Sequence, residues 1–397
     1  MTDAETIYKE LMSEEVGVWY VSDEYGSKMM IKIPSNSIRS LIKGCKMDLT
    51  FGKDIKVNKA YFHTGARVYD DAINHINISN PNKNFREYKA IQNIFREKEI
   101  VVEFYNELVI CVATAEINIL NEDRIKLLEF IGNIDILYVG DYNSEISLSL
   151  DAFDFTLDNS NFKNGAYEIP VIFIDCLLES WNNVNNTIIG ISDAYELNIS
   201  NLDEGGLFEK QVWASMETLF NFGLFLNPEV IENSKKRELT DILAIYEYGV
   251  FLLEIKALGV LGLDKDQSID RKVSNTQKQI RTAISQLVGA NKNVAKRFQI
   301  VSDNGLIINF NRNIVPHCIV LVSELFSFGE WADLEIEIMK TMVDEKIYLH
   351  VLDFREFMNF VKAAGGKKES FDYHLMQRAE KFAEVRSIHM RTRFKKE

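Results

Sequence analysis

The sequence is poor in the features that mark a secreted or membrane protein. Its 397 residues include only four cysteines and five prolines. The cysteines lie far apart and never form a CxxC pair, which argues against disulfides and against a structural zinc. No window reaches the roughly 18 apolar residues of a membrane span, and the acidic first residues do not resemble a signal peptide. We therefore expect a cytoplasmic protein without a membrane partner.

Several common catalytic motifs are also missing. The chain has no GxxxxGK[ST], HExxH or GxSxG sequence, and no GxGxxG after an expected strand. These absences argue against P-loop nucleotide hydrolases, HExxH zinc proteases, α/β-hydrolases and dinucleotide-binding enzymes. The composition, with 46% hydrophobic and 26% charged residues, can fill real cores and suits two or three domains at this length.

The formal net charge of −14 would by itself disfavour binding to phosphate groups. The cations are nevertheless concentrated in the second half of the chain. Residues 264–297 contain eight Lys or Arg against three Asp, and residues 386–397 contain five against one Glu. A basic run is as often an ordinary solvated face, and for the C-terminal run that interpretation stays open.

The two halves of the chain differ in their expected elements. Residues 1–203 favour a β-rich domain with strands at 16–21, 29–33, 100–104, 107–117 and 134–139, and helices at 2–12, 85–96 and 122–131. The 100–117 stretch predicts a hairpin that turns near Tyr105-Asn106, and strand-like stretches follow at 146–173 and 188–199. From 204 to 397 helices and strands alternate. We expect an α+β or α/β protein in which a β-rich N-terminal domain precedes an α/β domain.

The most informative stretch is RELTDILAIYEYGVFLLEIKA, residues 237–257. Two apolar runs flank Tyr248-Gly249, and a two-residue loop that ends in Gly predicts a tight hairpin. With this loop, Asp241 faces Lys256 across the hairpin. Residues two apart share a face of a strand, so Glu254 joins them. The hairpin therefore predicts two carboxylates and one ammonium at the end of an apolar sheet.

This combination of charges suggests a site for a divalent cation. Charged groups within apolar strands lose hydration, and such burial is tolerated when the groups pair or bind a metal. Mg²⁺ takes oxygen ligands, keeps several waters and needs only one or two carboxylates beside a phosphate. The simpler alternative is a cross-strand ion-pair cluster on a solvated sheet edge.

The same residues resemble the PD-(D/E)xK nuclease superfamily, whose fold is that of restriction endonucleases. In that pattern an Asp opens a β-hairpin and Glu-x-Lys lies on the second strand, which matches Asp241 and Glu254-Ile255-Lys256. The resemblance covers about residues 207–364 and leaves the first 200 residues outside. Thr240 stands where the motif name has Pro.

The resemblance implies roles for these residues. Asp241 and Glu254 would bind Mg²⁺ or Mn²⁺, and Lys256 would orient or deprotonate the attacking water. The superfamily also has a helix with a Glu before the hairpin. Here that helix is expected within residues 205–223, and Glu209 is the choice for the additional metal ligand because it falls on the apolar stripe. Glu217 is the second choice, and an ordinary acid near the helix N-terminus is the simpler alternative for Glu209.

A further helix is expected at residues 274–289, with Ser274 or Asn275 as its cap and Gly289 as its end. In related nucleases a Gln on this helix approaches the site, so Gln279 is proposed as a catalytic residue. The expected nucleic-acid contacts are Gln277, Lys278, Arg281 and Lys272. Ordinary helix surface is an equally good interpretation of the two glutamines.

The expected function is a Mg²⁺-dependent endonuclease that hydrolyses phosphodiester bonds, with DNA preferred to RNA as substrate. By analogy with similar nucleases, the protein would form homo-oligomers and act in defence against phage, with the N-terminal region regulating or targeting it. Two alternatives remain: a nuclease directed at RNA, and a nuclease fold kept as a nucleic-acid-binding or protein-binding module without cutting.

Overall fold

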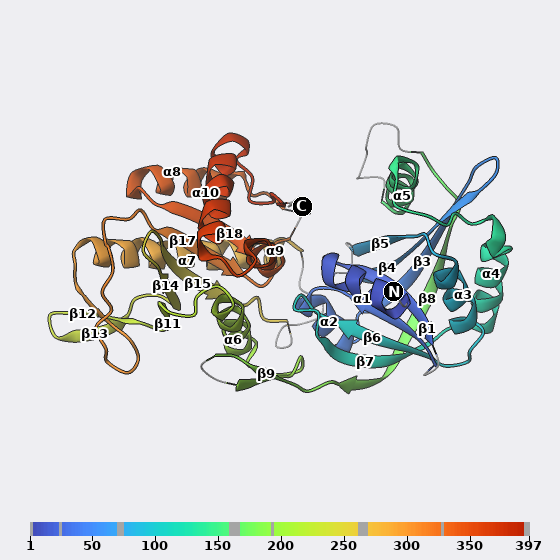
Figure 1. Cartoon of the computed structure of the whole chain (residues 1–397), viewed down its shortest axis with the longest axis horizontal. Coiled ribbons are helices and arrows are strands. Elements are labelled where there is room, and N and C mark those ends of the chain that lie inside the picture. The colour runs from blue at the N-terminus through green and yellow to red at the C-terminus, as the bar shows by residue number, and fades with distance from the viewer. Residues whose placement is uncertain are drawn as a thin grey trace. The chain divides into compact units, whose positions relative to one another are not determined.

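The computed structural model describes residues 3–23, 26–69, 75–158, 167–191, 194–260, 269–326 and 329–392. It shows a mixed α/β protein with several sheets (Figure 1). The described residues form two compact units. Unit 1 contains those up to Asn186 and Leu197–Ser200, and unit 2 contains Thr187–Glu196 and those from Asn201 onward.

Unit 1 is built on an eight-stranded sheet with the order β1-β2-β6-β7-β8-β3-β4-β5. The strands are β1 (Gly17–Asp23), β2 (Gly26–Lys32), β3 (Lys46–Ile55), β4 (Ala60–Tyr69), β5 (Ile76–Asn82), β6 (Ile100–Tyr105), β7 (Cys111–Asn118) and β8 (Val171–Asn183). The β2–β6 pair is parallel and the other pairs are antiparallel. The sheet curls, since the Val18 amide of β1 donates to Asn80 Oδ1 of β5 at 2.7 Å.

The helical segments of unit 1 are α1 (Asp3–Ser13), α2 (Ser35–Ile42), α3 (Phe85–Ile94), α4 (Asn121–Ile131), the 3₁₀ turn η1 (Ile134–Ile136) and α5 (Ser144–Leu157). The expected helices at 2–12, 85–96 and 122–131 are therefore present. The strand expected at 134–139 is wrong, because η1 occupies its start. The strand-like set from 146 is also wrong in its first part, because α5 occupies residues that alternate between apolar and polar side chains in the sequence.

Two expected strand regions differ in detail from the structure. The 100–117 hairpin is present as β6 and β7, but its loop covers Asn106–Ile110 and not only Tyr105-Asn106. The short strands β9 (Asn186–Ile189) and β10 (Ala194–Leu197) pair with each other in a separate two-stranded sheet. The last expected strand stretch, 188–199, thus forms parts of two short strands.

Unit 2 is built on a five-stranded sheet with the order β11-β14-β15-β17-β18. The strands are β11 (Leu224–Leu226), β14 (Ile242–Ile245), β15 (Val250–Lys256), β17 (His317–Val322) and β18 (Tyr348–Asp353). The first three pair antiparallel, and β15, β17 and β18 run parallel. A smaller sheet joins β12 (Glu229–Glu232), β13 (Lys235–Glu238) and β16 (Gln299–Val301).

Helices cover both faces of the five-stranded sheet. They are α6 (Glu204–Glu217), α7 (Ile269–Ala295), α8 (Ala332–Glu345), α9 (Phe354–Ala364) and α10 (Lys368–Val385). Apolar side chains of α7 and α8, such as Ile280 and Leu334, share a buried core with Leu252 and Val320 of the sheet. Aromatic contacts such as Phe251–Phe371 join α10 to the opposite face. Side chains of β15 therefore alternate between two buried layers.

Two helix boundaries differ from expectation. Helix α6 begins at Glu204, with Asp203 as the cap that accepts a hydrogen bond from the Gly206 amide at 3.0 Å, and it ends at Glu217 rather than near Gly223. Helix α7 runs through Ser274 and Gly289 without stopping. An internal glycine costs only about 1 kcal/mol, and the buried apolar stripe of α7 offsets it.

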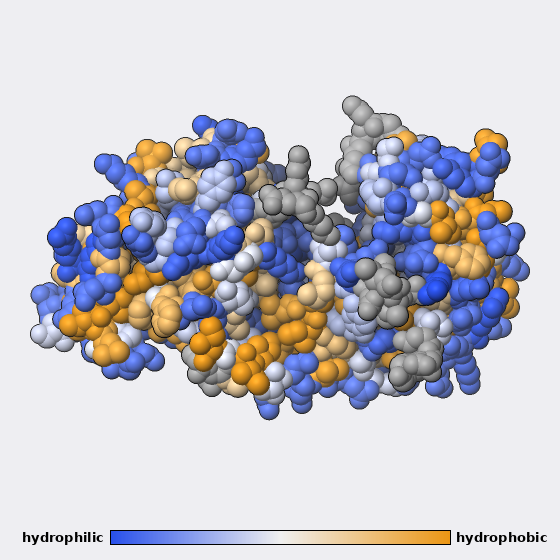
Figure 2. Space-filling model, viewed as in Figure 1, coloured by the Kyte–Doolittle hydropathy of each residue, from blue (hydrophilic) through white to orange (hydrophobic). Residues whose placement is uncertain are grey.

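The surface mixes polar and apolar residues, and Figure 2 shows hydrophilic residues over most of the visible face with hydrophobic patches between them. Among the helices of the described residues, none combines the length and the apolar character needed to cross a membrane.

Candidate functional site

The candidate site lies where β14 and β15 emerge from the apolar core of unit 2. The strands pair through Ile245↔Val250 and Ile242↔Leu253. Four residues, Tyr246–Gly249, lie between the strands, and the Tyr246 amide donates to the Gly249 carbonyl at 3.0 Å, so the expected loop at Tyr248-Gly249 is wrong. The register is shifted by two positions, which keeps every side chain on its expected face because the strand period is two. The same register places Asp241 opposite Glu254 instead of Lys256.

Two short hydrogen bonds hold Thr240 and Asp241 against β15. The Thr240 hydroxyl donates to the Leu253 carbonyl at 2.6 Å, and the Ile255 amide donates to Asp241 Oδ2 at 2.5 Å. Thr240 and Asp241 are both buried. The backbone of β15 therefore holds the Asp241 carboxylate at the sheet end.

Lys256 lies between the two acids. Its Nζ is 2.8 Å from Glu254 Oε2 and 3.8 Å from Asp241 Oδ2. Glu254 is only 2% exposed. The structure thus brings together the three residues that the motif selected, on the sheet face that α7 covers.

Burial makes this arrangement electrostatically costly for the carboxylates. Burial, together with the nearby Asp241 charge, raises the pKa of Glu254 to about 7. Burial alone would lower the pKa of Lys256, but the hydrogen bond to Glu254 and the charge of Asp241 raise it above its ordinary value. Lys256 is therefore a persistent cation at neutral pH. In this state it is suited to orient a water or to offset charge, and not to remove a proton.

Burial and the charge of this cluster also raise the pKa values of two further acids. Burial and then the Asp241 charge raise the pKa of Glu209, which extends from α6 and is half-buried. Desolvation and the same charge raise the pKa of Glu238, at the end of β13, which also shares a hydrogen bond with the Asp241 carboxyl. Glu209 was chosen from the sequence, and Glu238 was not. The only sequence signal for Glu238 is its position three residues before Asp241.

Glu217, the second choice for an additional ligand, has a different role. Its two carboxylate oxygens accept hydrogen bonds from Trp213 Nε1 and from the Ile191 amide, each at 2.9 Å. Its carboxylate therefore links the backbone at Ile191 to helix α6.

An open pocket of about 570 Å³ adjoins Lys256. Its lining residues come from the start of α6, the end of β15 and α7: Leu202, Asp203, Glu204, Gly205, Ile255, Lys256, Ala257, Gly259 and Gln279. Glu204 fixes one wall, because both of its carboxylate oxygens lie 2.8 to 3.0 Å from the Val260 amide. Gln279 is thus placed where a ligand beside Lys256 would meet it.

The other residues predicted on α7 do not line this pocket. Gln277 donates to the Glu330 carbonyl at 2.6 Å. Arg281 forms an exposed ion pair with Glu337 at 2.8 Å, while Lys278 is exposed and Lys272 is half-buried. Of the two glutamines on the first turns, the structure brings only Gln279 to the pocket.

Among the residues that the structure describes, no three His, Cys, Asp or Glu side chains are already arranged around a common metal position. Lys256 is the nearest cation to Glu254 and Asp241 and supplies the positive charge between them. Four carboxyl groups nevertheless surround this one ammonium: Glu209, Glu238, Asp241 and Glu254. This excess of oxygen donors and negative charge fits a hard divalent cation.

Comparisons with known proteins found no match for this chain. No protein-family model matches the chain, and neither a curated protein nor a solved structure matches it. The geometry of the site therefore carries the argument by itself.

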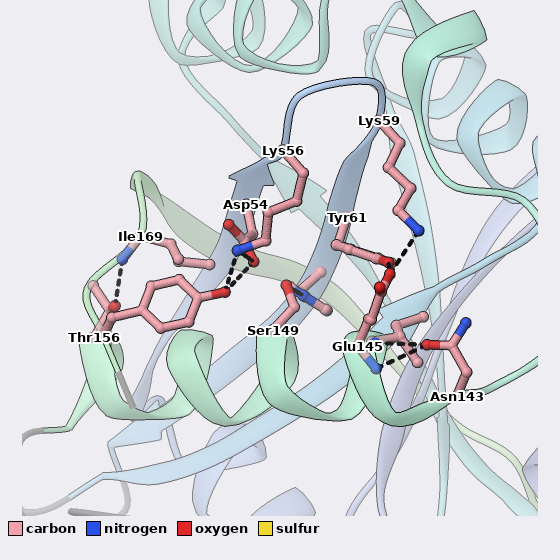
Figure 3. A network of polar contacts seen from close by, with 12 residues as sticks. Asp54, Lys56, Lys59, Tyr61, Asn143, Glu145, Ser149, Thr156 and Ile169 are labelled. Carbon is pink, nitrogen blue, oxygen red and sulfur yellow. Dashed lines mark hydrogen bonds and ion pairs between the residues drawn. The ribbon is translucent and has the colours of Figure 1, made fainter. Parts of the chain in front are cut away.

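Unit 1 contains the other conspicuous polar network (Figure 3). His63 Nε2 lies 2.7 Å from the Ser149 hydroxyl, a contact that would suit a nucleophile and its base. Both side chains are completely buried, and burial lowers the pKa of His63 to about 3. A substrate has no access to this pair, so we assign it to the attachment of α5 to β4.

The charged groups beside that pair also satisfy one another. Lys56 Nζ is 3.0 Å from Asp54 Oδ2, and the Tyr167 hydroxyl donates to the same carboxylate. Lys59 Nζ donates to Glu145 Oε2 at 2.6 Å (Figure 3). These contacts hold the β3–β4 loop and α5 together and leave unit 2 as the location of the better candidate.

Proposed function

We propose that unit 2 is a metal-dependent nuclease of the restriction-endonuclease-like type, which hydrolyses phosphodiester bonds and whose first substrate is DNA. The observation that carries the proposal is the convergence of Asp241, Glu254 and Lys256 at the end of β15. A helix with Glu209 before the hairpin and a helix with Gln279 after it support the proposal. Unit 1 would then regulate or target the enzyme.

The donor set indicates how a divalent cation would be held. Asp241 and Glu254 would be the central ligands. Glu209 and Glu238, whose pKa values burial and the Asp241 charge raise, would be the additional acids. Mg²⁺ or Mn²⁺, when bound there, would supply an acidified water and offset charge on the phosphate. Binding would also offset the burial and the Asp241 repulsion that raise the pKa of Glu254, since ligand carboxylates must be ionised.

The chain's own residues would position the substrate. The Lys256 ammonium can donate hydrogen bonds to the attacking water or to a phosphate oxygen, and its raised pKa keeps it charged. Gln279 can donate and accept at the pocket wall. The exposed Lys278 lies one residue away on α7 and can contact the phosphate backbone outside the pocket.

A plasmid-nicking assay with Mg²⁺ tests the proposal. Lys256→Ala and Asp241→Asn should each lower cutting by at least about a hundredfold, the usual effect of losing a key transition-state contact. The matched controls are Lys340→Ala and Asp344→Asn, which change exposed residues of α8 and should cut like the wild type.

Equal cutting by the wild type and both site variants would end the enzyme proposal. A parallel arm with labelled RNA distinguishes the substrates. Salt-sensitive DNA binding without cutting by any of the proteins would favour the non-catalytic binding module instead.

A further inference from the structure

A second pocket of unit 2 lies at the other end of the five-stranded sheet and on its other face. Phe251, His317 and Tyr348 are direct neighbours across β15, β17 and β18. Their rings stack, with centroid distances of 5.2 Å for Phe251–His317 and 4.9 Å for His317–Tyr348. Tyr246, from the β14–β15 loop, stacks on Phe251 and extends the row. Phe251 and His317 are buried within this stack, and Tyr246, His317 and Tyr348 of the row line the pocket.

A buried hydrogen-bond chain connects this surface to α10. Asp372 Oδ2 accepts from the Tyr246 hydroxyl at 2.5 Å, and Asp372 Oδ1 lies 2.8 Å from His317 Nε2. His350 Nε2 lies 3.0 Å from the other nitrogen of His317. Burial lowers the pKa of His350 far below its ordinary value, so its ring is neutral. The simplest assignment is that His350 donates from Nε2 to His317 Nδ1 and His317 donates from Nε2 to Asp372. The Asp372 carboxylate then accepts from two donors, the Tyr246 hydroxyl and His317 Nε2.

The pocket in front of this chain has a volume of about 320 Å³. We call it the tyrosine pocket, and its lining is Tyr246, Tyr248, Gly249, Ile314, Val315, His317, Tyr348, Glu369, Asp372, Tyr373 and Met376. Among these described residues there are four tyrosines and two acids and no lysine or arginine. The lining therefore combines the two acids Glu369 and Asp372 with four tyrosine rings.

This chemistry selects an organic cation. Aromatic faces attract ammonium and guanidinium groups, most strongly when the cation loses part of its water. The Lys368 ammonium already lies 5.5 Å from the centroid of the Tyr246 ring, so this ring does interact with a cation in the protein. A hard metal ion would find too few oxygens here, while an anion would meet two carboxylates.

We propose that the tyrosine pocket binds a small organic cation with an ammonium or guanidinium group. The aromatic rings would contact its body, and Glu369 and Asp372 would pair with its charge. The pocket lies at the start of β15, about 20 Å along the strand from Lys256 at about 3.3 Å per residue. The proposal is therefore independent of the nuclease site and does not rest on the proposed function.

Isothermal titration of the full chain tests this binding. The probes are agmatine, choline and 3,3-dimethylbutanol, the last being a neutral analogue of choline with the same shape. We expect saturable binding of at least one of the two cations and none of the neutral alcohol. Glu369→Gln and Tyr373→Leu should each weaken cation binding about threefold to tenfold. Both residues are exposed, so neither change threatens the fold.

Two controls locate the binding. Glu380→Gln changes an exposed acid of the same helix outside the pocket and should leave the affinity unchanged. Asp241→Asn should also bind normally, because it alters only the candidate nuclease site. The proposal is overturned if neither cation binds, if the neutral alcohol binds as tightly as choline, or if the two pocket variants keep the wild-type affinity.

Discussion

Replacing Glu254 with Gln should make the protein more stable at neutral and higher pH. The side chain is almost completely buried, and its pKa is raised from 4.5 to about 7. The folded protein therefore holds this proton more tightly than the unfolded chain does. Below about pH 4.5 the carboxyl is protonated in both states and costs nothing. As the pH rises from 4.5 through 7, its ionisation in the folded state progressively lowers the free energy of unfolding.

The size of this effect follows from the two pKa values. At about 1.4 kcal/mol for each pH unit between them, the loss reaches up to about 3 kcal/mol above pH 7. Gln has the same shape and does not ionise, so Glu254→Gln removes the loss. The variant should match the wild type near pH 4.5 and exceed it by up to about 3 kcal/mol at pH 8. A substitution that disturbed the packing would instead destabilise the protein at every pH, as most substitutions of buried side chains do.

Hydrogen exchange of peptides from β14 and β15 measures this difference for unit 2 alone. That choice matters because a chain with two units does not guarantee two-state unfolding. The comparison of wild type and variant at each pH cancels the titrating groups that do not interact with Glu254. Mg²⁺ adds a second readout: a cation at about a hundred times its Kd should stabilise the wild type by about 2.7 kcal/mol. Glu254→Gln should lose most of that gain.

Glu87 of unit 1 provides the matched control. Burial raises its pKa to about 7 as well, but its carboxylate accepts from the Lys83 and Asn84 amides in a capping box. Gln also serves in a capping box. Glu87→Gln should therefore show a similar pH-dependent gain in stability in peptides of α3. Mg²⁺ should not change the exchange of these α3 peptides. Parallel pH curves for wild type and Glu254→Gln, or equal Mg²⁺ stabilisation of both, would refute the reasoning.

Five further substitutions test other parts of unit 2. Glu209→Gln and Glu238→Gln should each raise the Mg²⁺ concentration needed for half-maximal nicking, whereas Glu217→Gln should leave it unchanged in a Mg²⁺ titration. Thr240→Val should lower the unfolding free energy by about 1 kcal/mol in urea titration, because the buried Leu253 carbonyl loses its donor. Arg391→Ala breaks a paired contact with Asp353 at 2.7 Å and 2.5 Å. It should speed proteolysis of the C-terminal segment, and an unchanged cleavage rate would show that this contact does not anchor it.

The location of the candidate site was predictable because a register shift of two positions leaves every side chain of a strand on the same face. The sequence favoured a two-residue loop at Tyr248-Gly249, and the structure has four residues there. A slip of one position would have turned Asp241 away from Glu254. A slip of two changes only the partner across the hairpin, so the convergence of charges survives.

Helix α5 shows where local pattern misleads. Apolar and polar residues alternate in Ile146-Ser147-Leu148-Ser149-Leu150, which is typical of a strand. The residues actually buried are Ile146, Ser149, Ala152, Phe153 and Leu157, with helical spacing. The decisive signal is Asn143, whose side chain accepts from two amides of the first turn. Tertiary packing that buries a serine against His63 cannot be inferred from hydropathy.

Glu238 could not be selected from the sequence for a different reason. Its strand β13 consists of four exposed polar residues without any buried face, so hydrophobic periodicity says nothing about where the strand lies. Its position depends on pairing with β12, which in turn pairs with β16 some 70 residues later. The pairing of β12 with β16 is long-range, and it sets the position of the β12–β13 hairpin that ends at Glu238.

Glu254 departs from the apolar pattern that the rest of its strand follows. Five consecutive residues of β15 from Val250 through Glu254 are buried, and four of them are apolar. Glu254 is the exception, and the acids around it share one ammonium. A sequence that satisfied packing alone would place an apolar residue there, as at Leu252 two positions earlier. A local rule broken within an otherwise consistent strand is expected at a functional position. The pH dependence of the Glu254→Gln variant measures how much stability the protein gives up to keep that carboxylate.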